Sequence, residues 1–237
     1  MSKTSSASPV SSASGQATAG VSAGASGPAS QAPASRRPNA RERLLDAALK
    51  LIRETGYAAT TVDALCAEAG ATKGAFFHHF ASKDDLAVAA AAHWGETTGA
   101  LFETAPYHDP DDALDRIFAY LDFRDALLAG TVPEFTCFAG TMIQEVHESA
   151  PAIRDAAYAC VTGHAHTLEA DFAEALALYG PPDAPSAQSL ALHTQAVLQG
   201  GFILAKGAGH AGPARETLAH LRRYLEQLFD RKETGHA

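Results

Sequence analysis

The stretch TTVDALCAEAGATKGAFFHHFASK, residues 60–83, predicts two short helices joined by a tight turn. The first helix is expected over 62–69, and Gly70 ends it because glycine tolerates the left-handed backbone that closes a helix. Thr72 is placed to cap the second helix, over 73–79, because a threonine oxygen accepts a hydrogen bond from the free N–H groups of a helix start. Two helices at this spacing are typical of a helix-turn-helix, whose second helix enters the major groove of DNA with its N-terminal residues.

The same stretch resembles the DNA-binding signature of the tetracycline-repressor-like (TetR/AcrR) regulators. The agreeing positions are Thr61, Val62, Leu65, Ala69, Gly70, Ala71, Thr72, Lys73, Gly74, His79, Phe80, Ser82, Lys83 and Leu86. The sequence departs at Phe77, where the family usually has a tyrosine whose hydroxyl commonly reaches a DNA phosphate. The resemblance implies that DNA is contacted by Thr61, Thr72, Lys73, Gly74, Ala75, Phe77, His79 and Lys83.

Charge is distributed unevenly along the chain. The 237 residues carry a net charge of −9, which by itself argues against binding to nucleic acid. Residues 36–83, however, hold eight basic and five acidic side chains, whereas residues 84–237 hold nine basic and 22 acidic ones. A small basic head on an acidic body is the pattern expected of a DNA-binding module with a separate sensor domain.

Composition and turn signals divide the chain into three parts. Residues 1–38 are rich in Ser, Ala, Gly and Pro, so we expect a disordered tail, which ends near Arg36 and Arg37. Residues 39–85 are expected to form the helix-turn-helix domain, and residues 86–232 a larger helical domain. The predicted fold is all-α: an N-terminal three-helix DNA-binding domain, followed by a domain that the resemblance assigns to ligand binding and dimerisation.

Capping residues and chain breaks predict the other helices. A helix over 39–54 precedes the motif, and a connecting helix over 83–103 follows it. In the resembled family this connecting helix transmits the ligand signal. Five more helices are expected, over 111–128, 136–148, 151–179, 186–206 and 213–231.

Leucines recur in the last of these helices. Leu218, Leu221, Leu225 and Leu228 are spaced three, four and three residues apart, which predicts a seam that packs against other helices. In the resembled family the last two helices pair with those of a second copy in a four-helix bundle. The resemblance therefore implies a homodimer, with Phe202 and the four leucines at its interface.

The expected body also carries side chains suited to the wall of a small-molecule pocket: Trp94, Phe102, Phe118, Phe123, Cys137, Met142 and Tyr158. The sequence has no glycine-rich phosphate loop and no GxSxG or HExxH motif, so we expect neither an enzyme nor a cofactor. His164 and His166 stand two residues apart in an expected helix and do not face each other, so no metal site is expected.

Other features bear on the cellular compartment. No apolar run approaches the 18 residues of a membrane span, and residues 1–35 have no apolar stretch typical of a signal peptide. Three widely spaced cysteines do not indicate a disulfide framework. We therefore expect a cytoplasmic protein that does not bind a membrane.

These features predict a transcriptional regulator, most often a repressor in the resembled family. It would bind a double-stranded DNA operator and be released by a small-molecule effector. One alternative is a regulator that senses oxidants or electrophiles through Cys137, because a thiol at a helix N-terminus can be reactive. Another alternative is a helical enzyme or carrier, which no catalytic motif supports.

Overall fold

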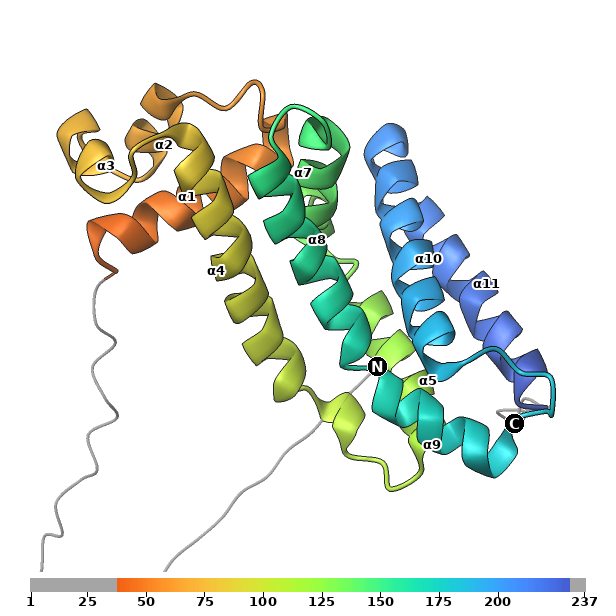
Figure 1. Ribbon diagram of the computed structural model, residues 1–237. Coiled ribbons are helices and arrows are strands. Elements are labelled where there is room, and N and C mark those ends of the chain that lie inside the picture. Colours follow the sequence, from red (N-terminus) through yellow and green to blue (C-terminus); the bar gives the residue numbers. More distant parts are fainter. Residues whose placement is uncertain (1–37, 231–237) are drawn as a thin grey trace, which may run out of the picture. The chain divides into compact units, whose positions relative to one another are not determined.

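The computed structural model describes residues 38–230, and every regular element between them is a helix (Figure 1). The all-α fold class is therefore confirmed. The expected tail lies outside the described residues except for Pro38, and Arg36 and Arg37 lie outside them too. Residues 38–230 belong to one compact unit, and the domain boundary expected after residue 85 stays a prediction.

Three helices form the N-terminal head: α1 (Ala40–Thr55), α2 (Val62–Glu68) and α3 (Lys73–His79). α1 begins with a reciprocal cap. The Asn39 side chain accepts a hydrogen bond from the Glu42 N–H at 2.9 Å, and the Asn39 N–H donates to the Glu42 carboxylate at 2.8 Å. α1 ends before Gly56, whose φ of 88° suits glycine.

The head helices bury their apolar faces in a core that also takes side chains from the rest of the chain. The apolar side chains that α1, α2, α3 and the following loop bury together include Leu44, Leu45, Ala48, Ile52, Leu65, Phe76 and Phe80. Helices of seven residues such as α2 and α3 are not stable alone in water. Because burying one leucine-sized side chain contributes about 1.5–3 kcal/mol, this shared core is what stabilises them.

α4 (Lys83–Glu103) connects the head with the rest of the chain (Figure 1). Ser82 caps its start by accepting a hydrogen bond from the Asp85 N–H at 3.0 Å. Leu86, in its first turns, is buried in the head core, whereas Phe102, near its end, belongs to a second apolar cluster. One continuous helix is therefore packed into both cores.

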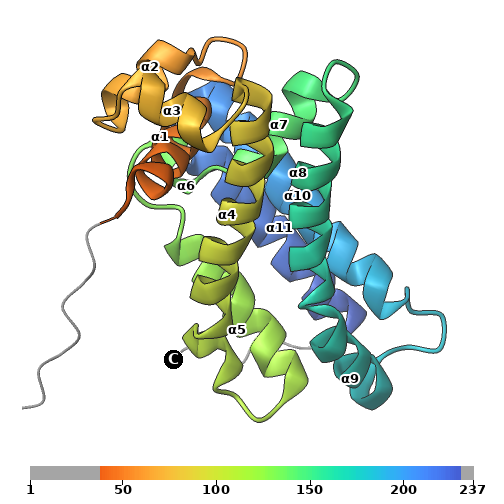
Figure 2. The ribbon, with the colours of Figure 1, turned by 60° about the vertical axis from the view of Figure 1, so that its left-hand side comes forward.

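The described body continues with η1 (Pro106–His108), α5 (Ala113–Ala126), α6 (Val132–Phe135), α7 (Phe138–Val146), α8 (Pro151–His166), α9 (Glu169–Tyr179), α10 (Ala187–Ala208) and α11 (Gly212–Leu228). α10 and α11 pack against each other, and α4 packs against α8 (Figures 1 and 2). α7 packs on α8 and also touches α1 of the head.

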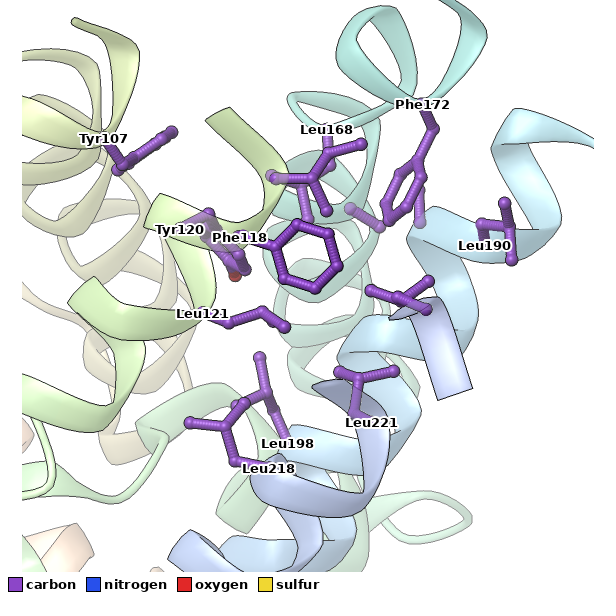
Figure 3. Close-up of a cluster of buried hydrophobic side chains, with 14 of the residues drawn as sticks. Tyr107, Phe118, Tyr120, Leu121, Leu168, Phe172, Leu190, Leu198, Leu218 and Leu221 are labelled. Atoms are coloured by element: carbon purple, nitrogen blue, oxygen red, sulfur yellow. The ribbon is translucent and has the colours of Figure 1, made fainter. Parts of the chain in front are cut away.

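The second core lies where α5 meets the C-terminal helices. Figure 3 shows Phe118 and Tyr120 of α5 gathered with Leu198 of α10 and with Leu218 and Leu221 of α11. All five side chains are buried. The leucines of α11 therefore face the core of their own chain.

The single helix predicted over 151–179 is wrong, because α8 ends at His166 and α9 begins at Glu169. The Thr167 hydroxyl donates to the His164 carbonyl at 2.8 Å, and the Leu168 N–H donates to the carbonyl three residues back, not four. Side-chain bonding of this kind competes with the helical ladder. Neither glycine nor proline marks the break, so the usual signals for a helix end are absent there.

The helix predicted over 136–148 also differs. The short α6 precedes it, with Pro133 tolerated in the first turn. α7 then begins at Phe138, and its cap is Cys137 rather than Thr136. The Cys137 sulfur accepts a hydrogen bond from the Gly140 N–H at 3.3 Å.

Candidate functional site

The starts of α2 and α3 are fixed by two threonine caps. The hydroxyls of Thr61 and Thr72 each accept a hydrogen bond from the N–H three residues along, at 3.1 Å. Except for the half-buried Ala75, the residues that were expected to contact DNA at this surface are exposed: Thr61, Thr72, Lys73, Gly74, Phe77 and His79. An exposed helix start suits contact with both phosphates and base edges.

Two exposed side chains of α3 stand out. Phe77 is 57% exposed, although its ring touches that of Phe76 with centroids 5.1 Å apart. An apolar ring in this position suits contact with a thymine methyl group. The Lys73 ammonium lies 2.7 Å from the Asp63 carboxylate, but both side chains are more than half exposed. Such a pair adds little stability and leaves the lysine free to turn toward a phosphate.

Lys83 has a different environment. Its ammonium donates to the carbonyls of Tyr57 and Thr60 at 3.0 and 3.1 Å, and it lies 4.1 Å from the centre of the Tyr57 ring. The side chain is half-buried. Lys83 therefore closes the loop between α1 and α2, and contact with a phosphate stays a prediction for its remaining N–H group.

The same loop is held from the body by Glu145 of α7. The two carboxylate oxygens of Glu145 accept hydrogen bonds from the N–H groups of Tyr57 and Ala58, both at 3.1 Å. The approach is close, because a Cβ added to Gly56 would lie 2.6 Å from one of these oxygens. We call this contact the Glu145 clamp.

Arg53 forms a second joint between head and body. Its guanidinium donates to the Glu134 carbonyl at 3.1 Å and lies 5.1 Å from the centre of the Trp94 ring. Together with the Glu145 clamp, this contact ties α1 and the loop after it to α4, α6 and α7.

The body encloses a cavity of about 460 Å³, which is within the size range of small-molecule sites. Its wall comes from α4, α5, α6, α8, α10 and the segment that starts α7. Three of the seven residues expected in a pocket line it: Trp94, Phe102 and Cys137.

The other four lie elsewhere. Phe118 is buried against α11, and Met142 is buried in the core shared with the head. Phe123 packs its ring on Phe102 at 5.5 Å but is not part of the wall, and Tyr158 is 60% exposed. Helical periodicity marks all four as apolar without saying which interior they face, so these assignments to the wall were wrong.

Sequence reasoning missed the polar part of the wall, which includes Arg124, His164 and Gln195. Behind it, the buried Tyr120 hydroxyl lies 3.0 Å from His164 Nε2 and accepts a hydrogen bond from the Gln195 amide at 3.1 Å. Burial, and to a smaller extent the charge of Arg124, lowers the pKa of His164 to about 3. His164 is therefore neutral at physiological pH.

Two thiols and one hydroxyl also line the cavity. Burial, with a smaller effect of Cys137, raises the pKa of Cys160 to about 11, so this thiol is protonated and unreactive at neutral pH. Cys137 caps α7 from the same wall. The Thr136 hydroxyl is buried, and it has no hydrogen-bond partner within residues 38–230.

The expected dimer surface needs correction. Leu218, Leu221 and Leu225 are buried in the core of their own chain, as is Phe202, which lines the cavity, and Leu228 is half-buried. Large apolar side chains are exposed instead on other positions of α10 and α11: Leu192, Ile203, Leu204 and Tyr224. A groove of about 660 Å³ runs between these two helices and is lined by Leu204 and Tyr224.

Within the part of the chain that is described, no three His, Cys, Asp or Glu side chains come together as a metal site. None of the helices described there is long and apolar enough to cross a membrane.

Known proteins resemble this chain in the sequence of its head and in its fold. Residues 44–90 match the family described as bacterial regulatory proteins, tetR family. YerO of Bacillus subtilis, an uncharacterized HTH-type transcriptional regulator, is 37% identical over 54 residues, which span 23% of this chain and 19% of YerO. A TetR-family transcriptional regulator from Agrobacterium tumefaciens superimposes with a TM-score of 0.69 at 19% identity, covering 80% of this chain and 97% of that one. The chain is therefore similar to TetR-family transcriptional regulators, in the sequence of its head and in its fold.

The likeness extends beyond the head. A TetR transcriptional regulator from Chloroflexus aurantiacus gives a TM-score of 0.67 at 27% identity, covering 79% of this chain and 94% of that one. The sequence match over residues 44–90 includes the two capped helices and the first turns of α4. The motif therefore lies in the segment that matches the tetR-family model, and the body that follows resembles the fold of TetR-family regulators.

Proposed function

We propose that this regulator is a homodimeric, cytoplasmic repressor that binds operator DNA through α3 and releases it when a small molecule occupies the cavity. The observation that carries the proposal is the position of α7. One end of α7, at Cys137, borders the cavity, and the other end, at Glu145, holds the loop between α1 and α2. A ligand that moves the start of α7 thus acts on the head through the same helix.

The proposed DNA surface is the exposed side of α3 and its cap. Lys73 donates to phosphate or to guanine, since an ammonium group can do both. Phe77 contributes an apolar contact to a base edge, and the hydroxyls of Thr61 and Thr72 lie beside the helix starts. Contact by His79 and Lys83 belongs to the proposal on the strength of the family resemblance.

The effector acts by shifting a population between two arrangements of the head. It can do so only to the extent that it binds one arrangement more tightly than the other. Two contacts between head and body can differ between these arrangements. One is made by Arg53, whose guanidinium lies over the ring of the cavity residue Trp94, and the other is the Glu145 clamp.

A second copy is proposed to cover the exposed apolar face of α10 and α11. Leu204 is 54% exposed beside the groove between the two helices, and Ile203 and Leu192 are exposed on α10 as well. Exposed apolar residues gathered on two neighbouring helices mark an interaction surface. Pairing through a twofold axis would present the two α3 helices to successive major grooves, about 34 Å apart.

Fluorescence anisotropy with DNA from the protein's own promoter region tests the proposal. We expect specific binding at physiological salt, and Lys73→Met should weaken it and reduce the slope of log K against log salt by about one. Equal binding of the promoter fragment and a scrambled fragment of the same length would contradict the proposed function.

A second candidate is thiol sensing through Cys137, favoured by the position of its sulfur at the start of α7 and on the cavity wall. Operator binding by the wild type and by Cys137→Ser, before and after treatment with N-ethylmaleimide, separates the two. We expect release by a non-covalent ligand to persist in Cys137→Ser. Loss of all release in that variant would favour the thiol sensor.

A further inference from the structure

We infer that the cavity takes an aromatic carboxylate, with its anionic end on Arg124 and its ring against the apolar wall. This inference rests on the proposed role of the cavity as the effector site, and it names the chemical class of the effector.

The wall suits a flat apolar body. Trp94 and Phe102 from α4, Phe135 from α6 and Phe202 from α10 all contribute rings to it. Aromatic side chains pack well against another ring in offset or edge-to-face arrangements. A volume of about 460 Å³ accepts one or two rings with a short side chain.

Arg124 is the residue of the wall that favours a negatively charged ligand. Its guanidinium lies over the rings of Phe102, Phe202 and Tyr120, at 5.1, 5.7 and 5.9 Å from their centres. No carboxylate of residues 38–230 lies within ion-pair distance of it. The Tyr120 hydroxyl accepts one hydrogen bond from Arg124. The remaining N–H groups of the guanidinium are left for a partner, and a carboxylate matches two of them with parallel hydrogen bonds.

The other charge on the wall is already engaged. Glu134 accepts hydrogen bonds from the Thr131 N–H at 2.6 Å and from the Thr131 hydroxyl at 2.8 Å, in the cap that starts α6. These bonds lower the pKa of Glu134, and the side chain is exposed. A cationic ligand would therefore have to displace the Thr131 hydrogen bonds or water from the Glu134 carboxylate. An anionic ligand would not have to displace an acidic side chain from Arg124.

The neutral groups of the wall present donors. Tyr120 has one phenolic proton and already accepts a hydrogen bond from Gln195, so donating that proton to His164 Nε2 satisfies the buried hydroxyl. The proton of the neutral His164 ring is then on Nδ1 and available as a donor. Thr136, which also lines the cavity, has a buried hydroxyl without a partner in the described chain. One unpaired cation and two neutral donors suit an anion better than a cation.

Three probes of similar size and different charge test the inference: 4-phenylbutyrate, 4-phenylbutanamide and 4-phenylbutylammonium. Trp94 is the single tryptophan of the chain and lines the cavity, so its fluorescence reports occupancy, and calorimetry gives an independent dissociation constant. We expect the wild type to bind the carboxylate at least about tenfold more tightly than the amide, and to bind the ammonium most weakly, as a charged hydrogen bond predicts.

Arg124→Gln removes the charge and should bring the carboxylate and the amide to within about threefold of each other. Arg124→Lys keeps the charge without the planar edge, so it should retain a reduced preference for the carboxylate and provides a test if the glutamine variant does not fold. Arg154→Gln is the matched control, because Arg154 lies on α8 outside the cavity wall.

The inference is overturned if the wild type binds none of the probes, binds the amide or the ammonium at least as tightly as the carboxylate, or keeps its preference in Arg124→Gln. Promoter binding by the wild type, measured on the same preparation, separates these results from failure of the proposed function. A wild type that binds the promoter but shows no charge preference contradicts only the effector class. A wild type that prefers the carboxylate but binds no promoter contradicts only the repressor function.

Discussion

The ammonium groups of Lys73 and Lys83, two lysines of the proposed DNA surface, have different surroundings. Lys73 is exposed and pairs with the exposed Asp63. Lys83 bonds two backbone carbonyls of the loop between α1 and α2. The ammonium group of Lys73 is thus available to a ligand, whereas that of Lys83 is bonded to the backbone of its own chain.

We expect Lys83→Met to lower the free energy of unfolding by about 2 kcal/mol, because hydrogen bonds from a charged donor contribute about 1.5–3 kcal/mol. Urea unfolding followed by circular dichroism measures this. Lys73→Met is the matched control, since exposed substitutions usually have small effects on stability. Equal unfolding curves for the two variants would show that the Lys83 contacts do not stabilise the loop.

His164 predicts a dependence of stability on pH. Its pKa is near 6.5 when unfolded and about 3 in the folded chain, so the unfolded state binds more protons between these values. Stability contributed by the neutral ring is therefore present above pH 6.5 and is lost as pH falls toward 3. Between pH 7 and pH 5 we expect the wild type to lose about 2 kcal/mol more than His164→Gln.

Urea unfolding at the two pH values makes this comparison. His147→Gln, an exposed histidine at the end of α7, is the control and should follow the wild type. If His164→Gln also follows the wild type, His164 does not remain neutral in the folded protein.

At the scale of elements, α7 reaches the head through the Glu145 clamp. Gly56→Ala should be destabilising on two counts: a φ of 88° costs an alanine about 1 kcal/mol, and the new Cβ displaces the Glu145 carboxylate. In a Glu145→Ala background the second cost disappears. The double variant should therefore lose at least about 0.5 kcal/mol less than the sum of the two single variants.

The unfolding free energies of the four proteins in this cycle provide the measurement. Strict additivity would mean that the clamp does not couple α7 to the loop. Glu148→Ala, an exposed substitution just beyond α7, should show additivity with Gly56→Ala and serves as the control.

Elements with local signals were predictable. Asn39, Thr72 and Ser82 are caps whose side chains compete for free N–H groups, and the predicted helices over 73–79 and 83–103 agree with α3 and α4. The break between α8 and α9 was not predictable, because it depends on a hydroxyl of Thr167 that turns back to its own helix. Many threonines do this without ending a helix.

The site was less predictable than the fold. The leucine spacing in α11 correctly indicated burial, but periodicity cannot distinguish the core of one chain from an interface between two. Arg124 gave no signal at all, since a single arginine in a helix is ordinarily on the surface. Its role emerges only when α4, α5 and α10 bring three rings around it.

At the scale of the whole molecule, we expect Leu204→Glu to dissociate the proposed homodimer. A carboxylate in the middle of an apolar interface would be buried without a partner, which is strongly unfavourable. Light scattering coupled to gel filtration should report half the mass of the wild type. Leu178→Glu is the matched control, because Leu178 is 60% exposed on α9 and does not line the groove between α10 and α11. Two variants of unchanged mass would place the interface elsewhere.

One position in α10 has a consequence for the shape of the response to effector. Phe202 lines the cavity, while the next residue, Ile203, is exposed on the proposed dimer face. In a homodimer only α10 would separate the effector in one protomer from the other protomer. Effector bound in one cavity would therefore change the affinity of the second cavity for effector, and the effect would be the same in both directions. We expect operator release to follow a sigmoidal dose curve with a Hill coefficient between one and two. Leu204→Glu should bind effector with a coefficient of one. Genes under such control would turn on over a narrow range of concentration rather than in proportion to the signal.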